Sequence, residues 1–438
     1  MLETFDTVDW ANLPHAYGPA TDVPGQLRAL GSAERGVREK ALGELNANIV
    51  HQGSRYLATA PAVPFLLELL ADPSTPIGPE ILGLLARLAI GDDHSPLDGY
   101  AISVLREAAE GGPELLADAA AQVSMAQEPH PARPEPSADT ECEDEEEDEE
   151  EDEDEEDDLL PIERYVEDLP HEEQTRIHAF VELAAYDAVR AGLPLVRSLL
   201  DAEDAAVRTA AAHLLAWFPE EAATALPALE RIVGDPDPVV AATALVAVGR
   251  LAEPGPARAP RLLDDALDDP RDLVRWGAAT ALARLNGPRA DRAVADALRE
   301  RVSRDTERGE EVPFFDGDVR GYAARSLCLL GDDHIDETLT TLLARLPEIS
   351  GGEALHVAGA ALRLAFPERP LSAGTPFATL HDRQRRLIRA LADSPGTWRL
   401  GGRPFGNFAA LMRTYGLPTE VDALAAYATG ARTEGSTG

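Results

Sequence analysis

Apolar residues recur four and eight places apart in three segments near the middle of the chain. The first set is Val207, Ala211 and Leu215, and equivalent sets begin at Val240 and Val274, with spacings of 33 and 34 residues. Positions four apart share one face of a helix. The small residue in the middle of each set leaves room for a neighbouring helix to approach closely. The pattern therefore predicts three similar buried helices, one in each repeat.

Each of these predicted helices follows a second apolar segment, so a repeat contains two helices. The three preceding segments are Leu193–Leu200, Leu226–Val233 and Ala259–Leu267. The turns are rich in aspartate and proline, as in Asp235–Pro238, and proline can open a helix without the loss of a hydrogen bond. A helix pair of this size cannot bury its apolar face alone, so neighbouring pairs stack. The sequence predicts an all-α fold, an α-α superhelix or solenoid.

The same template recurs outside the central repeats. Sets begin at Val37 and Ile77 in the first quarter of the chain, and at Val319 after an insertion that lengthens the repeat to 45 residues. The segment Leu193–Leu285 resembles HEAT repeats. Its period and composition favour HEAT units over TPR or ankyrin units, because the tryptophan–tyrosine and "TPLH" signatures of the latter two are absent.

The resemblance to HEAT repeats extends to single residues. Asp269 and Arg275, six apart, resemble the Asp–Arg ladder that links adjacent HEAT units, whereas Asp72 and Asp235 occupy the equivalent place without the arginine. The segments "DWANLPHAYG", "HQGSRY" and "RPFGNFAALMRTYGLP" resemble an uncharacterised family of actinobacterial HEAT-repeat proteins. This resemblance covers nearly the whole chain and implies the fold but no activity.

A long acidic run interrupts the repeats. Eighteen of the twenty positions from Asp139 to Asp158 are Asp or Glu, and a proline-rich stretch precedes them. Like charges at this density cannot collapse onto a core, so we expect a disordered acidic linker, with docking of a basic partner as the alternative role. The predicted divisions are 1–126, an N-terminal HEAT-like helical subdomain; 127–158, the linker; 159–370, the HEAT-repeat array; and 371–438, a C-terminal helical cap and tail.

Charge narrows the classes of partner. The net charge is −40, and the acidic run supplies 18 of the negative charges, so the rest of the chain still carries −22. Such a field repels phosphate backbones and anionic membrane surfaces. We therefore expect a protein partner, with the charge favouring a basic one, and no binding to nucleic acid or membranes.

Composition limits the kinds of chemical site that the chain can form. The two cysteines, Cys142 and Cys328, cannot form a disulfide framework or a four-thiolate zinc site. Lys40 is the single lysine and does not follow a glycine-rich loop, which excludes a Walker A site. We expect no cofactor. The amino terminus lacks the apolar segment of a signal peptide, and no window of 18 apolar residues occurs, so we expect a cytoplasmic protein.

Arginines and aromatic residues on or beside the second helices are candidate partner contacts, because Trp and Arg are favoured interface anchors. Two phenylalanines lie in the polar insertion Val302–Asp318, and insertions in repeats often map to the binding face. The alternatives are a solvated helix face for the first group and an insertion that folds back over the solenoid for the second. The protein-binding candidates are Arg208, His213, Arg275, Trp276, Phe314, Phe315, Arg320, Tyr322 and Arg325.

A second polar cluster is expected at the start of the array, where "HQGSRY" ends a predicted repeat helix. Its side chains could form a ligand pocket or an acid/base pair, or could instead satisfy backbone groups at the exposed end of the first repeat. The residues of this possible pocket are His15, Tyr17, His51, Gln52, Arg55 and Tyr56. The motif "GDDH" at Gly91–His94 and Gly331–His334 is interpreted as a helix stop and cap rather than a metal site.

These observations lead to three hypotheses of function. The first is a non-catalytic scaffold or adaptor that binds another protein on the concave face of a HEAT solenoid. The second is an immunity or inhibitor protein that neutralises a basic toxin, because the negative charge would speed association with such a target. The third is an enzyme built on HEAT helices, such as a lyase, with His51, Tyr56 and Asp92 as its candidate residues.

Overall fold

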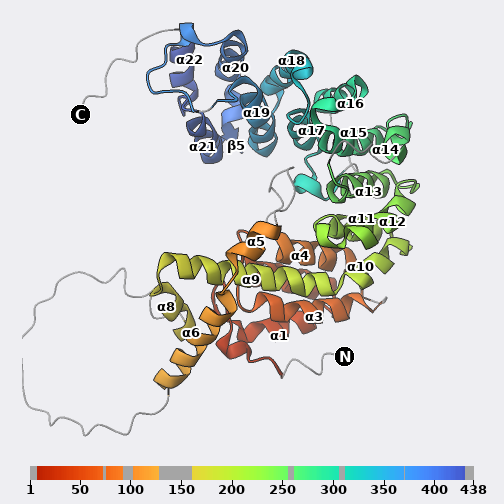
Figure 1. The fold of residues 1–438 in the computed structure, drawn as a ribbon, viewed down its shortest axis with the longest axis vertical. Helices are drawn as coiled ribbons and strands as arrows, with labels where there is room; N and C mark the ends of the chain where they lie inside the picture. Colours follow the sequence, from red (N-terminus) through yellow and green to blue (C-terminus); the bar gives the residue numbers. More distant parts are fainter. Residues whose placement is uncertain are drawn as a thin grey trace, which may run out of the picture. The chain divides into compact units, whose positions relative to one another are not determined.

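The computed structural model describes residues 7–72, 75–91, 102–127, 160–254, 261–304, 311–368 and 370–429. The described chain is helical in both of its compact units, which confirms the all-α prediction (Figure 1). Within the described ranges, strands occur only as three two-stranded antiparallel hairpins. The acidic run lies outside the described residues.

The first compact unit comprises Met1–Asp92 and Tyr100–Leu195. Its elements are β1 (Pro14–His15), β2 (Gly18–Pro19), α1 (Val23–Ala29), α2 (Arg35–Ile49), β3 (Val50–His51), β4 (Ser54–Arg55), α3 (Thr59–Leu70), α4 (Gly78–Ile90), α5 (Ile102–Ala108), α6 (Gly112–Gln127), α8 (Pro161–Glu167) and α9 (His171–Ala191). The long helix α9 packs against α3, α4, α5 and α6, and its side chains Ile177, Ala185 and Val189 are buried. The apolar face of α9 is buried against α3–α6, so the first unit continues to Leu195. The division predicted from the sequence instead placed the start of the HEAT-repeat array at residue 159.

The second compact unit comprises Asp93–Gly99 and Val196–Gly438. Helix α10 (Leu193–Ser198) spans the boundary. The further elements are α11 (Ala205–Leu215), α12 (Ala222–Ile232), α13 (Pro238–Leu251), α14 (Arg261–Ala266), α15 (Asp272–Asn286), α16 (Arg292–Ser303), α17 (Val319–Leu327), α18 (Ile335–Arg345), α19 (Gly351–Ala365), α20 (Asp382–Ala392), β5 (Arg399–Leu400), β6 (Arg403–Pro404), α21 (Gly406–Thr414) and α22 (Val421–Thr429).

Helices of this second unit form two rows. Helices α11, α13, α15, α17 and α19 each contact the next, and we call them the inner row; α12, α14, α16 and α18 form the outer row (Figure 1). Small residues bring inner helices together, as the sequence predicted. A Cβ atom added at Gly249 would lie 2.5 Å from Ala281 Cα, and one added at Gly277 would lie 2.9 Å from the Ala242 carbonyl oxygen. The stacked helix pairs make this unit a solenoid.

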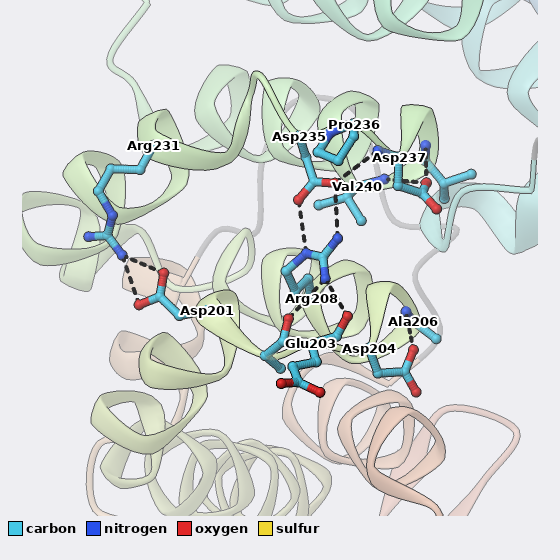
Figure 2. Close-up of polar contacts among 12 residues, drawn as sticks. Asp201, Glu203, Asp204, Ala206, Arg208, Arg231, Asp235, Pro236, Asp237 and Val240 are labelled. Carbon is cyan, nitrogen blue, oxygen red and sulfur yellow. Dashed lines mark hydrogen bonds and ion pairs between the residues drawn. The ribbon is translucent and has the colours of Figure 1, made fainter.

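An arginine ladder joins the loops that precede the inner helices (Figure 2). Arg208 Nε and Nη2 donate to the Asp235 carboxylate of the next repeat at 2.8 and 3.0 Å. Its Nη1 donates to the carbonyl oxygens of Ala202 and Glu203, both at 2.9 Å. The same side chain therefore ties its own loop to the following one, and the hydrogen bond to Asp235 raises the pKa of Arg208.

The ladder continues one repeat further with a change of partners. Arg271, and not Arg275, binds the Asp269 carboxylate, with Nη2 at 2.9 Å from Oδ2, while Arg275 Nη1 donates to the Asp269 carbonyl oxygen at 2.9 Å. Arg271 also reaches back to the Asp235 carbonyl oxygen at 2.7 Å. That carbonyl lies six residues before Ala241, where the repeat has no arginine of its own. An arginine from the next loop thus fills the gap in the sequence pattern.

Candidate binding groove

The insertion between α16 and α17 folds back onto the inner row. The Phe314 ring lies 4.7 Å from the ring of His213 in α11 and 6.2 Å from the ring of Trp217 just after that helix. It also stacks on Tyr322 of α17 at 6.2 Å, all distances being between centroids. Phe314 and Phe315 are only 2% and 3% exposed. The insertion therefore joins repeats that are distant in sequence, which corresponds to the fold-back alternative.

Most of the predicted contact residues consequently have structural partners. Trp276 and Tyr322 are buried, and so is His213. The side chains of Arg208 and Arg275 belong to the ladder described above. These five side chains and the two phenylalanines are therefore engaged within the fold and are not exposed anchors.

Two predicted arginines of α17 remain near an accessible surface. Arg320 Nη2 pairs with Glu353 Oε2 of α19 at 2.9 Å. Arg325 has its guanidinium carbon 5.3 Å from the centroid of the Phe315 ring. Both arginines are half-buried, and Arg325 lines the groove described next.

A left-handed turn shapes the start of α17. Phe315, Asp316 and Gly317 have φ of 58°, 50° and 82°, a conformation that costs free energy in side chains other than glycine. The turn places Asp318 just before α17, where its Oδ1 accepts a hydrogen bond from the Gly321 backbone N–H at 2.8 Å. Its Oδ2 lies 2.7 Å from His356 Nδ1 of α19, and the His356 and Phe315 ring centroids are 4.2 Å apart. Two helices of the inner row are thereby tied together at one end.

Beyond this turn lies a groove with a volume of about 1000 Å³. Helix α19 lines it with His356, Gly359, Ala360 and Arg363, which recur at helical spacing on one face. Helices α17 and α21 and strand β5 also contribute to its lining. A Cβ added at Gly359 would meet only a Leu411 methyl group, at 3.9 Å. Small residues on α19 therefore leave the space open.

Most residues of this groove were not among the candidates predicted from the sequence. Only Phe315 and Arg325 were candidates; His356, Arg363 and the α21 residues were not. The signal that was present is the small-residue spacing of Gly352, Gly359 and Ala360 in "GGEALHVAGAALRLA", which resembles the earlier inner helices.

Burial and neighbouring charges shift the pKa of two ionisable groups in the groove. Burial raises the pKa of Glu353, against the opposing effect of Arg320 and Arg345. Burial also raises the pKa of the Cys328 thiol to about 12. A thiol is nucleophilic only as thiolate, so Cys328 is unsuited to covalent catalysis at neutral pH.

Several residues of the possible pocket in the first unit belong to a hydrogen-bond network. The Tyr17 backbone N–H donates to His15 Nδ1 at 3.0 Å, so Nε2 carries the proton and donates to Asp22 Oδ1 at 3.0 Å. Asp22 Oδ2 also accepts hydrogen bonds from Gln26 and Asn48, at 2.7 and 2.9 Å. The lone pair of His15 that a general base would need is already engaged.

The "HQGSRY" segment forms a hairpin and does not end a helix, because α2 stops at Ile49 and β3 pairs with β4. Gln52 has φ of 49° and the following glycine also adopts a left-handed conformation, which allows the tight two-residue turn. His51 Nδ1 lies 3.3 Å from the Tyr17 hydroxyl. Arg55 is almost fully buried and pairs with Glu182 of α9 at 2.9 Å. The hairpin is thus part of the packing of the unit.

This arrangement does not favour acid/base catalysis by the candidate residues of an enzyme. Burial raises the pKa of Tyr56, which makes its hydroxyl harder to ionise, and Asp92 lies outside the described residues. Gly91 ends α4 with φ of 72°, as expected for a helix stop. In the second copy, Gly331 has φ of −73°, and neither the short helix Asp332–His334 nor α18 has a side-chain cap, so the predicted stop and cap are not seen there. In the described parts of the chain, no three His, Cys, Asp or Glu side chains are grouped to hold a metal ion.

Comparisons with known proteins agree with the repeat pattern. The HEAT repeats family model matches residues 169–249 and 226–310, and no curated protein matches the chain. A crystal structure of an engineered protein is 18% identical over 94% of this chain and 98% of that chain, but its TM-score of 0.29 is too low to support an argument. No helix in the described ranges has the length and apolar character needed to span a membrane. The similarity to HEAT repeats therefore covers residues 169–310 of this chain.

Proposed function

We propose that this chain is a non-catalytic scaffold that binds a segment of another protein in the groove bounded by α17, α19 and α21. The observation that carries the proposal is the contrast along the inner row. The insertion packs on its α11 end through Phe314, whereas the α19 end keeps an open groove of about 1000 Å³. Stacked helical repeats characteristically present extended surfaces to partners.

The dimensions favour a peptide segment over a folded domain. Helix α19 contains 15 residues, so at 1.5 Å per residue it offers a floor about 22 Å long. An extended segment of six or seven residues has this length. Its side chains could fill the space that Gly359 and Ala360 leave open.

The charge of the chain favours a basic partner. With −40 overall and −22 outside the acidic run, the chain attracts positively charged proteins and raises their association rate at low salt. A free cysteine, Cys328, is consistent with a reducing compartment, and we place the protein in the cytoplasm as part of this proposal.

A matched pair of variants at Gly359 tests the proposal. Gly359→Ala adds one methyl group at ordinary contact distance from Leu411, whereas Gly359→Phe places an aromatic ring in the groove. Wild type and both variants serve as bait in native lysate, and captured proteins are identified by mass spectrometry. Circular dichroism shows whether each bait is folded.

The expected result is a stoichiometric partner that wild type and Gly359→Ala retain and Gly359→Phe loses. Direct titration with the purified partner should reproduce that order of affinity. A partner that binds folded Gly359→Phe as tightly as wild type would place the interaction elsewhere. Recovery of no partner by any bait would remove the support for a scaffold.

A further inference from the structure

Two arginines from neighbouring helices line the groove, Arg325 of α17 and Arg363 of α19. Arg325 lies toward Phe315, with its guanidinium carbon 5.3 Å from the ring centroid. The Phe315 ring in turn lies 4.2 Å from the ring of His356, two helical turns before Arg363. Arg363 itself lies near the carboxyl end of α19.

Arg363 lacks the carboxylate partner that Arg320 and Arg345 possess. Among the described residues, its side chain makes no hydrogen bond or ion pair, and it is exposed. By contrast, Arg320 binds Glu353, and Arg345 binds Glu348 and Glu353. A guanidinium that lies in a concave site without a carboxylate partner favours an anionic ligand, because opposite charges attract each other.

An exposed apolar residue marks the other end. Leu400 of the β5–β6 hairpin is 54% exposed although it lines the groove. It lies near the start of α19, since a Cβ added at Gly351 would be 2.9 Å from its Cδ1. Large apolar side chains exposed within a concave surface are typical of binding sites.

We propose that the groove binds an extended peptide segment through a carboxylate at Arg363 and through an apolar side chain at Leu400. This inference rests on the proposed function and names the chemistry of the ligand. From Gly351 to Arg363 the helix rises about 18 Å, at 1.5 Å per residue. An extended chain covers that length in about five residues, so the carboxylate and the apolar side chain are separated by about that number.

A carboxylate fits this site better than a phosphoryl group. The same groove contains Asp316, Asp318 and Glu353, and a phosphoryl group with a charge of about −1.5 to −2 would meet stronger repulsion from them than a single negative charge does. A planar carboxylate can also accept two parallel hydrogen bonds from one guanidinium.

The test uses phage-displayed random dodecapeptides, panned against the full chain in two formats, one with a free carboxyl terminus and one without. Enriched peptides are synthesised, and their affinities are measured by fluorescence polarisation for wild type, Arg363→Gln, Arg413→Gln and Gly359→Phe. Arg413 is the matched control, because it is exposed on α21 and is not part of the groove lining.

We expect the enriched peptides to carry a carboxylate about five residues from an apolar side chain. Of the two arginine variants, only Arg363→Gln should bind these peptides more weakly, by at least about tenfold. Amidation of the terminus, compared with Asp→Asn or Glu→Gln in the peptide, distinguishes a terminal from a side-chain carboxylate.

The outcomes separate the two proposals. Loss of binding in Gly359→Phe with full binding in Arg363→Gln would keep the groove and overturn the carboxylate site. Enriched peptides without a carboxylate would overturn it as well. Undiminished binding by Gly359→Phe, or the failure of both formats to yield a binding peptide, would count against the groove itself.

Discussion

The same substitution, glycine to alanine, should have opposite effects at two positions of the inner row. Gly249 lies in α13, where an added Cβ would be 2.5 Å from both Cα and Cβ of Ala281 on α15. Gly359 lies in α19, where the nearest atom, Leu411 Cδ2, would be 3.9 Å away. The first site is closed by the backbone of a neighbouring helix, and the second opens into the groove.

The expected magnitudes follow from two terms. Alanine in place of glycine in a helix interior stabilises by about 0.5–1 kcal/mol. Gly359→Ala should therefore raise the free energy of unfolding by that amount. At Gly249 the gain is opposed by overpacking, which costs about 1–3 kcal/mol, and contact with backbone favours the upper half of that range. Gly249→Ala should therefore lower the free energy of unfolding by about 1–2.5 kcal/mol.

Native-state hydrogen exchange with mass spectrometry measures both effects locally, which matters because helical repeats open in parts. Protection of α13 and α15 should fall in Gly249→Ala, and protection of α19 should rise in Gly359→Ala. Urea midpoints followed by far-UV circular dichroism give the global comparison. If both variants shifted protection in the same direction, close helix approach at Gly249 would be refuted as the controlling factor.

Three further outcomes are expected. Asp235→Asn removes the charge held by Arg208 and should lower unit stability by about 1–3 kcal/mol, seen as a lower urea midpoint; an unchanged midpoint would show that the ladder contributes nothing. Because hydrogen bonding to an arginine lowers the pKa of Asp269 in the folded state, this carboxylate stabilises at neutral pH, and its contribution disappears as the pH falls below about 4. The urea-midpoint difference between wild type and Asp269→Asn should therefore shrink in acid, and a constant difference would contradict this. In a Cys142→Ser background, a Cys328 pKa of about 12 instead of 9.0 predicts native-state alkylation by iodoacetamide at pH 8 about a thousand-fold slower than in urea; equal rates would exclude a buried thiol.

The local sequence pattern predicted the helix pairs, but it did not predict which side chains form ion pairs. The four-residue recurrence at Val240 identified α13, and Asp237 caps that helix by accepting a hydrogen bond from Val239 N at 2.8 Å. The Asp–Arg spacing suggested a pair between Asp269 and Arg275. In the structure, however, Arg271 takes the carboxylate, because it lies two residues away and its guanidinium can bind both oxygens.

The candidate site was less predictable, since it depends on contacts between segments far apart in the chain. Nothing in the composition of the insertion indicates that Phe314 packs on His213, about a hundred residues earlier. Nor does the pattern of α19 reveal that α21 leaves Gly359 uncovered.

By itself, the amino-acid sequence determined that this chain forms stacked helix pairs, because the apolar spacing and the small residues can be satisfied only by helices with close neighbours. The tertiary structure decided which inner faces remain accessible. That outcome depends on how the insertion and the terminal helices pack, and such long-range contacts are settled by the sum of many small burial energies, which no short motif encodes.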